Sequence, residues 1–267
     1  MRTSSKFFTA VLALPLLLAV HASAQENPYD IVGKVLLPFA RIFIPAARTQ
    51  NHALTAVLTL DEATGLPADS AGQTIEVEAQ SPDKLRLHTT LLGQEITLCR
   101  NGDDVWAFPG SKIDALISTQ TDTLPPENPN FKLPLFRLPL TEKQLVFLPI
   151  LFQVQDAGST DVAGEPCRVL DLVLMPELAR ALKAQDWTAR LWVGPGYHLA
   201  RVTLVRGDKW HAVVSIKKLD YAPSLPDETW QPTGAEAADV LKLTPGRYGQ
   251  LLEAATRGLT KLKSPPQ

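Results

Sequence analysis

The sequence predicts an α+β protein built mostly from antiparallel strands in one strongly curved sheet. Short runs in which apolar and polar residues alternate recur along the chain between tight turns, as in residues 83–110 (DKLRLHTTLLGQEITLCRNGDDVWAFPG). The 22 prolines and the modest aromatic content of 7% fit many loops and short strands better than a helical bundle. A very apolar helical pattern near the N-terminus needs a hydrophobic surface to lie on, and a half-open sheet would provide one.

Residues 1–24 have the pattern of a signal peptide. Arg2 and Lys6 precede an apolar run of about 14 residues, and Ala22-Ser23-Ala24 matches a small-residue cleavage site, so we expect cleavage after Ala24 and export. The alternative is an N-terminal anchor helix, which the shortness of the apolar run disfavours. No Cys follows that run, so lipid attachment of the bacterial lipoprotein kind is not predicted.

Residues 25–267 are expected to form a single domain, because no long polar linker divides them. The formal net charge of the whole chain is −2. Loss of two cations with the leader brings it to roughly −4. A nucleic-acid-binding protein would need a clustered basic face, which the sequence lacks, so no nucleic-acid partner is expected.

The first mature element is predicted as an apolar helix within residues 28–47, interrupted by Pro38 and Pro45. It is either a lid across the sheet or an ordinary core helix. Strands are expected next in residues 51–63 and in residues 74–80, where Ile75 and Val77 alternate with glutamates.

The chain then continues with the three strands of residues 83–110 and a short helix capped by Ser111. The later elements are predicted in this order: a Pro-rich loop over residues 121–139, a helix with Thr141 as its N-cap, a strand over 165–176, a short helix from Pro176, three strands within 189–223, an extended edge segment at 225–232, and an amphipathic helix at about 244–263. The total is about nine or ten strands.

Cys99 and Cys167 are the only cysteines, and both lie in predicted strands. In an oxidising compartment such a pair is a disulfide candidate. The alternative is two separate buried thiols. Two distant cysteines without neighbouring histidines do not make a metal site.

No catalytic motif stands out in the sequence. It contains no HExxH, no GxSxG and no Walker loop, and its mature histidines are scattered: His52, His88, His198 and His211. We therefore expect no enzymatic activity and no cofactor.

Apolar and aromatic residues on the predicted strands are the remaining candidates for a functional site. A curved sheet too wide to be filled by its own side chains leaves a cavity for an apolar ligand. The alternative is that these residues are ordinary core. The predicted cavity residues are Leu85, Leu87, Trp106, Phe108 and Trp192.

The order of motifs resembles that of the LolA-like periplasmic proteins over roughly residues 28–232. The motifs are PDKLRL at residues 82–87, NGDDVW at 101–106, GEPCRVLDLVLMP at 164–176 and WVGPGYHLAR at 192–201. This resemblance implies an unclosed antiparallel β-barrel (a half-barrel) whose helices form a lid over a hydrophobic cavity. It also implies a periplasmic location. The lipoprotein chaperone of that family holds its lid closed with an arginine on an early strand, and the motifs do not assign its equivalent here.

The function implied by the resemblance is non-covalent binding of acyl chains, of a lipoprotein or another lipid, during transfer towards the outer membrane. The partners would then be the lipid or lipoprotein and a partner at the inner or outer membrane. The alternative hypothesis is a non-catalytic sensor or scaffold that binds a partner protein through the sheet edge or the Pro-rich segment.

Overall fold

The computed structural model describes residues 26–44, 51–65, 70–91, 93–119, 125–138 and 140–251. The predicted signal peptide, residues 1–24, lies outside the described residues. Within those ranges, no helix has both the length and the apolar character needed to cross a bilayer.

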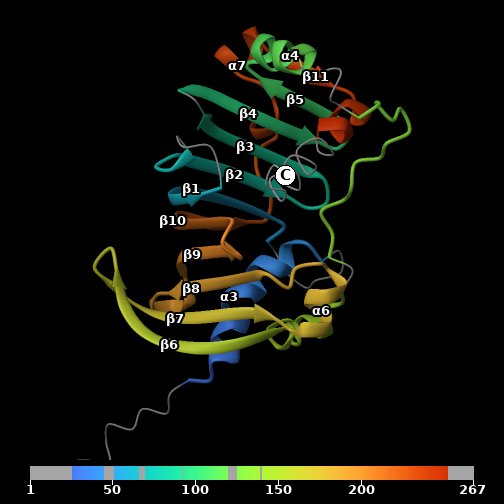
Figure 1. Cartoon of the computed structure of the whole chain (residues 1–267). Helices are drawn as coiled ribbons and strands as arrows, with labels where there is room; N and C mark the ends of the chain where they lie inside the picture. The colour runs from blue at the N-terminus through green and yellow to red at the C-terminus, as the bar shows by residue number, and fades with distance from the viewer. Residues whose placement is uncertain are drawn as a thin grey trace, which may run out of the picture.

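The fold is organised by one antiparallel sheet of eleven strands in the order β11-β5-β4-β3-β2-β1-β10-β9-β8-β7-β6 (Figure 1). Two meanders, β1–β5 and β6–β10, meet along β1 and β10, and the sheet does not close into a barrel. The predicted fold class is confirmed. The strands are β1 Ala53–Thr64, β2 Thr74–Gln80, β3 Lys84–Leu91, β4 Gln94–Asn101, β5 Asp104–Phe108, β6 Phe152–Val162, β7 Glu165–Leu174, β8 Trp187–Val193, β9 Leu199–Arg206, β10 Trp210–Ala222 and β11 Leu241–Leu243.

One long helix and several short ones accompany the sheet. They are α3 Pro28–Ile42, α4 Gly110–Thr119, α5 Glu142–Leu145, η3 Leu148–Leu151, α6 Pro176–Ala181, η4 Pro195–Tyr197, η5 Asp227–Trp230 and α7 Ala235–Ala238. The helix α3 ends at Ile42, before Pro45, whereas Pro38, which was expected to interrupt it, lies inside the continuous helix. Thr141 is the N-cap of α5, and its backbone N–H donates to Gln144 Oε1 at 2.8 Å. The predicted C-terminal helix is described only over residues 245–251, which are helical.

Three further local predictions are wrong. Residues 227–230 form the 3₁₀ helix η5 instead of an extended segment. Ser111 does not cap α4, since Gly110 is already helical. The cap comes from Asp239. Its carboxylate accepts hydrogen bonds from the Ser111 backbone N–H at 2.8 Å and from the Ser111 hydroxyl at 2.7 Å. The sheet has eleven strands, because β6 and β11 were not predicted. The strand β6 directly follows a helical pattern, and β11 has only three residues.

The two faces of the sheet have different covers. We call the face that carries α3 the inner face, and Ile31, Val32 and Val35 of α3 are buried there against a patch of the second meander. That patch consists of Leu170, Leu172, Leu191 and Val193. At its other end α3 places Ile42 on a second patch, formed by Leu54, Ala56 and Ala79. The helix α3 therefore bridges both meanders.

The outer face is covered over β3–β5 by residues 223–240, which we call the outer strap. Trp230 of the strap packs on Cys99 and Trp106, all three of them buried. Trp106 Nε1 donates a hydrogen bond to the Trp230 carbonyl oxygen at 3.0 Å. In the first meander, β4 and β5 are thus buried on both faces.

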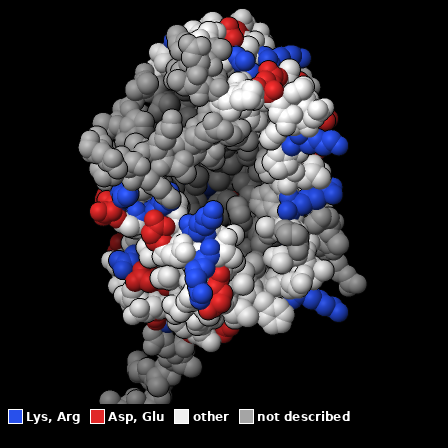
Figure 2. Space-filling model, turned by 45° about the vertical axis from the view of Figure 1, so that its right-hand side comes forward, with Lys and Arg blue, Asp and Glu red and all other residues white. Residues whose placement is uncertain are grey.

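Charge is distributed unevenly over the surface. Figure 2 shows Lys and Arg side chains projecting one after another along the right-hand side of the molecule, whereas the acidic side chains in that view gather at the top and the lower left. Cations therefore face solvent on a side of the molecule with few carboxylates in view.

Candidate functional site

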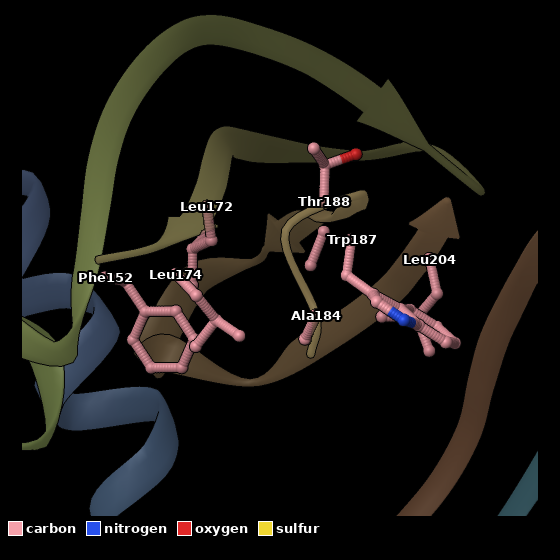
Figure 3. Close-up of a pocket in the computed structure, with 8 residues that line it drawn as sticks. Phe152, Leu172, Leu174, Ala184, Trp187, Thr188 and Leu204 are labelled. Atoms are coloured by element: carbon pink, nitrogen blue, oxygen red, sulfur yellow. The ribbon is translucent and has the colours of Figure 1, made fainter. Parts of the chain in front are cut away.

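An apolar cavity of about 350 Å³ lies against the inner face of the second meander. A volume of this size is within the range of small-molecule sites. Its lining comes from β6 to β9 and from the loop that leads into β8: Phe152, Leu172, Leu174, Ala184, Trp187, Thr188, Ala189 and Leu204. In Figure 3, Phe152 and Leu174 lie together at one end, and Trp187 and Leu204 lie together at the other.

The strand register explains why these residues meet. Leu172 pairs with Ala189, and Ala189 pairs with Leu204, so the three side chains form one row across β7, β8 and β9. Phe152 pairs with Leu174 one step along the same face. Ala189 in the middle of the row has only a methyl group, and this short side chain leaves space between its larger neighbours.

Aromatic stacking fixes one wall of the cavity. The ring centroids of Trp187 and Trp210 are 5.4 Å apart, and the Arg206 guanidinium lies 5.4 Å from the Trp187 ring centroid. Arg206 also pairs with Asp186 at 3.2 Å. The Trp187 indole is therefore held by contacts with two residues of the neighbouring strands, Arg206 of β9 and Trp210 of β10.

The cavity is an open pocket whose lining offers little polar chemistry. Seven of its eight lining residues have aliphatic or aromatic side chains, and the indole N–H of Trp187 is the polar group among them. The eighth, Thr188, alternates with Trp187 and Ala189 along β8, so its side chain points to the outer face. Among the described residues no group of three or more His, Cys, Asp or Glu is placed to hold a metal ion. This lining suits a hydrocarbon chain.

The helix α3 lies beside the cavity on the same face and is fastened at its N-terminal end. The Tyr29 hydroxyl accepts a hydrogen bond from the backbone N–H of Val154 in β6 at 3.4 Å. Lys34 donates to the Tyr197 hydroxyl at 2.8 Å and also pairs with Glu26. The hydrogen bond from Lys34 holds the pKa of Glu26 below its usual value.

A second cover lies over the inner face of the first meander. Residues 125–138, the Pro-rich segment, place Phe131 and Leu133 with Val105 and Ala107 of β5. Arg100 of β4 is buried beneath this segment and donates to the Pro134 carbonyl oxygen. Arg100 shares the parity of the apolar residues Ile96 and Leu98 in β4, and a basic residue in an otherwise apolar row is the sequence signal that would have singled it out.

The five predicted cavity residues are divided between the two faces, and none of them lines the apolar cavity. Leu85 is on the inner face, packed with the patch under Ile42, and Leu87 has the same parity. Trp106 and Phe108 are on the outer face under the strap. Trp192 also faces outward, beside Arg201, whose guanidinium lies 5.9 Å from its ring centroid.

Trp192 lines a separate, more polar trough on the outer face, with a volume of about 620 Å³. The charged pair Arg190–Asp171, with Nε and Oδ1 2.6 Å apart, lies in its wall, and Glu62 and His211 border it. Its polar and charged lining makes it a poorer place for a hydrocarbon than the inner-face cavity.

The predicted disulfide is wrong. Cys99 and Cys167 are free and buried. They lie in β4 and β7, which are seven steps apart in the sheet order, a separation of about 34 Å along the sheet at ~4.8 Å per step. A disulfide requires α-carbons within ~7 Å. The alternative of two separate buried thiols is the one observed.

Comparison with known proteins gives distant likenesses. No protein family and no curated protein matches the chain. A solved structure of the lipoprotein LppX of Mycobacterium tuberculosis is similar over 74% of this chain and 96% of that one, with 11% identity and a TM-score of 0.41. MucB is similar over 80% of this chain and 65% of that one, with 14% identity and a TM-score of 0.39.

A LolA superfamily protein from Nitrosomonas europaea is similar over 78% of this chain and 98% of that one, with 12% identity and a TM-score of 0.29. At these TM-scores the likenesses assign no function to the chain.

Proposed function

We propose that the protein is an exported, non-catalytic carrier that shelters an acyl chain of a lipid or lipoprotein in the inner-face cavity, for transfer towards the outer membrane. The observation that carries the proposal is the cavity of about 350 Å³ with its almost wholly apolar lining next to α3. Such a cavity has no group to activate a substrate, and its apolar contacts favour the burial of hydrocarbon.

The energetics of a chain in this cavity are favourable. Burial of a methylene contributes about 0.8 kcal/mol, so about ten methylenes contribute on the order of 8 kcal/mol. That gross value corresponds to a dissociation constant of about 1 μM before the entropic cost of association. A carrier needs affinity of this moderate kind, because its cargo has to leave again.

The proposal is tested by titrating the purified protein with a long-chain fluorescent fatty acid. Ala189→Phe fills the middle of the Leu172–Ala189–Leu204 row, and we expect it to weaken binding by roughly tenfold or more, the loss of at least two buried methylenes. Ala157→Phe, at an exposed position of β6, is the matched control and should bind like the wild type.

Ala184→Trp is a second filling variant at the loop side of the cavity, where the backbone is free of strand pairing. It keeps the test valid if Ala189→Phe fails to fold, and thermal unfolding of each variant decides that point. Unchanged affinity in both folded filling variants, or no binding by the wild type, would refute the carrier. The sensor or scaffold hypothesis would then be the one to pursue.

A further inference from the structure

Exposed apolar side chains are concentrated in one short segment next to the cavity. Val146, Phe147 and Ile150 are 67%, 59% and 58% exposed, and Leu151 is 39% exposed. These four residues, which we call the apolar tip, lie at the end of α5 and in η3. Large apolar groups in such a cluster mark a surface that contacts something other than water.

Buried residues next to the apolar tip pack on the rest of the protein and hold the tip in place. Leu145, just before the tip, and Pro149, within it, are buried. Leu148 packs into a cluster with Ala40 and Ile44 at the end of α3. The segment is therefore apolar on both sides, one side packing on the protein and the other facing outward.

The apolar tip adjoins the cavity through one covalent neighbour and one backbone hydrogen bond. Phe152, which lines the cavity, directly follows Leu151. The Leu151 carbonyl accepts a hydrogen bond from the Met175 backbone N–H at 2.9 Å, and Met175 directly follows Leu174, another lining residue. A chain leaving an apolar phase at the tip would thus meet the cavity lining directly.

The charges around the apolar tip favour an anionic surface. The acidic residues of α5 and α6 are both paired, Glu142 with Arg41 and Glu177 with Arg180. Two further cations are exposed on these two elements, Lys143 in α5 and Lys183 just after α6. Lys183 follows Leu182, which is itself 61% exposed. Apolar side chains flanked by cations are the pattern of insertion at the interface of an anionic bilayer.

We propose that the apolar tip docks the protein on the surface of a phospholipid bilayer containing anionic lipid, with Phe147 and Ile150 inserted among the acyl chains. This inference rests on the proposed function, because it supplies the route by which an acyl chain passes between bilayer and cavity. Lys143 and Lys183 would hold the lipid phosphates.

The test is flotation of the full chain with vesicles of phosphatidylethanolamine and phosphatidylglycerol. The wild type should float, and Phe147→Ser/Ile150→Ser should lose vesicle affinity by roughly tenfold or more. Leu135→Ser, which removes a side chain 50% exposed on the Pro-rich segment, is the control and should float like the wild type. Lys143→Glu/Lys183→Glu should float less on these vesicles and show no change on pure phosphatidylcholine.

Two further measurements separate the possible failures. Uptake of a free fluorescent fatty acid without vesicles reports on the cavity alone, so a wild type that takes up fatty acid but does not float overturns the docking and leaves the carrier intact. A wild type that floats but takes up no fatty acid keeps the docking and removes the carrier. Flotation of Phe147→Ser/Ile150→Ser at the wild-type level overturns the inference, as does sedimentation showing a wild-type dimer that this variant dissociates.

Discussion

Arg100 Nη1 donates a hydrogen bond to the carbonyl oxygen of Pro134, joining the C-terminal end of β4 to the Pro-rich segment above it. Arg100 is only 3% exposed, and its Nε donates to the Gly102 carbonyl at 2.9 Å. Its guanidinium also lies 5.0 Å from the Phe136 ring centroid. One side chain thus contacts the Pro-rich segment at two points.

Replacement of Arg100 by Leu should loosen the Pro-rich segment. The Phe136 and Leu138 backbone N–H groups donate to Pro82 and Phe43, both at 2.7 Å, and their hydrogen exchange reports on whether the segment stays closed. We expect faster exchange at both amides and a loss of about 1–3 kcal/mol of stability. Arg137→Leu, in the same segment, is the control, and equal exchange in the two variants would contradict this role for Arg100.

Glu236 should be the main polar anchor of the outer strap. It accepts hydrogen bonds from Thr97 Oγ1 at 2.7 Å and Arg86 Nη2 at 2.6 Å. Glu236→Gln leaves the partly buried Arg86 without this ion pair and should cost about 1–3 kcal/mol in urea unfolding. Glu228→Gln, an exposed position of the same strap, should be neutral, and an equal loss there would count against a specific anchor.

At acidic pH the wild type and Glu236→Gln should have the same free energy of unfolding. Burial raises the pKa of Glu236, but the hydrogen bonds from Thr97 and Arg86 outweigh burial, so its pKa is lowered from the model-peptide value of 4.5. A lowered folded-state pKa gives stability that is present above 4.5 and is lost as the pH falls through the folded-state value. Burial raises the pKa of Glu78, on the other side of Arg86, so its contribution runs in the opposite direction.

Glu78 is present in both the wild type and Glu236→Gln, so its contribution cancels to first order in the difference between their free energies of unfolding. Urea unfolding of both proteins at neutral pH and again below pH 4.5 measures this difference. A difference that stays constant across this range would show that the Glu236 carboxylate is not the group responsible.

Both thiols should be inert and reduced in the native protein. Burial raises the pKa of Cys99 to about 12, and burial also raises the pKa of Cys167. We expect a thiol reagent at neutral pH to label neither cysteine in buffer and both in urea without reductant. Absence of labelling in urea, together with a mass lower by two hydrogens, would instead demonstrate the disulfide.

Gly110 should tolerate no larger residue. A methyl group added there would lie 2.6 Å from the Leu241 nitrogen and 2.8 Å from the Asp239 oxygen, where β11 joins the sheet. Gly110→Ala should therefore cost about 1–3 kcal/mol in thermal or urea unfolding. Ala115→Ser, at an exposed position of α4, is the control. A Gly110→Ala variant as stable as the wild type would contradict the prediction, because it would mean that β11 can shift without loss of stability.

Alternation in the sequence was sufficient to predict individual strands but not their orientation. Ile75 and Val77 alternate with glutamates, and the strand predicted over residues 74–80 is β2. In β4 and β5 both faces are buried, Val105 towards the inner face and Trp106 beneath the outer strap. Alternation carries no information about orientation where both faces are covered, so the aromatic residues there were assigned to a cavity that they do not line.

The cavity itself depends on register across strands that are distant in sequence. Phe152 begins β6 and Leu204 lies in β9, and they share one lining only because each strand between them pairs in a particular register. The apolar pattern of α3 was visible in the sequence, and so was the need for a surface to receive it. The position of Arg100 beneath the Pro-rich segment depends on tertiary contacts that no local pattern specifies.

The order of the strands also bears on how the chain folds. Each meander pairs neighbours in sequence, so each can form from local contacts, whereas the seam between them joins Ala53 to Ala222. Pairing across such a span has a large loop-closure entropy and is intrinsically slow. The slowest step in folding should therefore be the pairing of β1 with β10. Until then two half-sheets with unpaired edges are exposed to aggregation, the state in which a newly made chain would most need a chaperone.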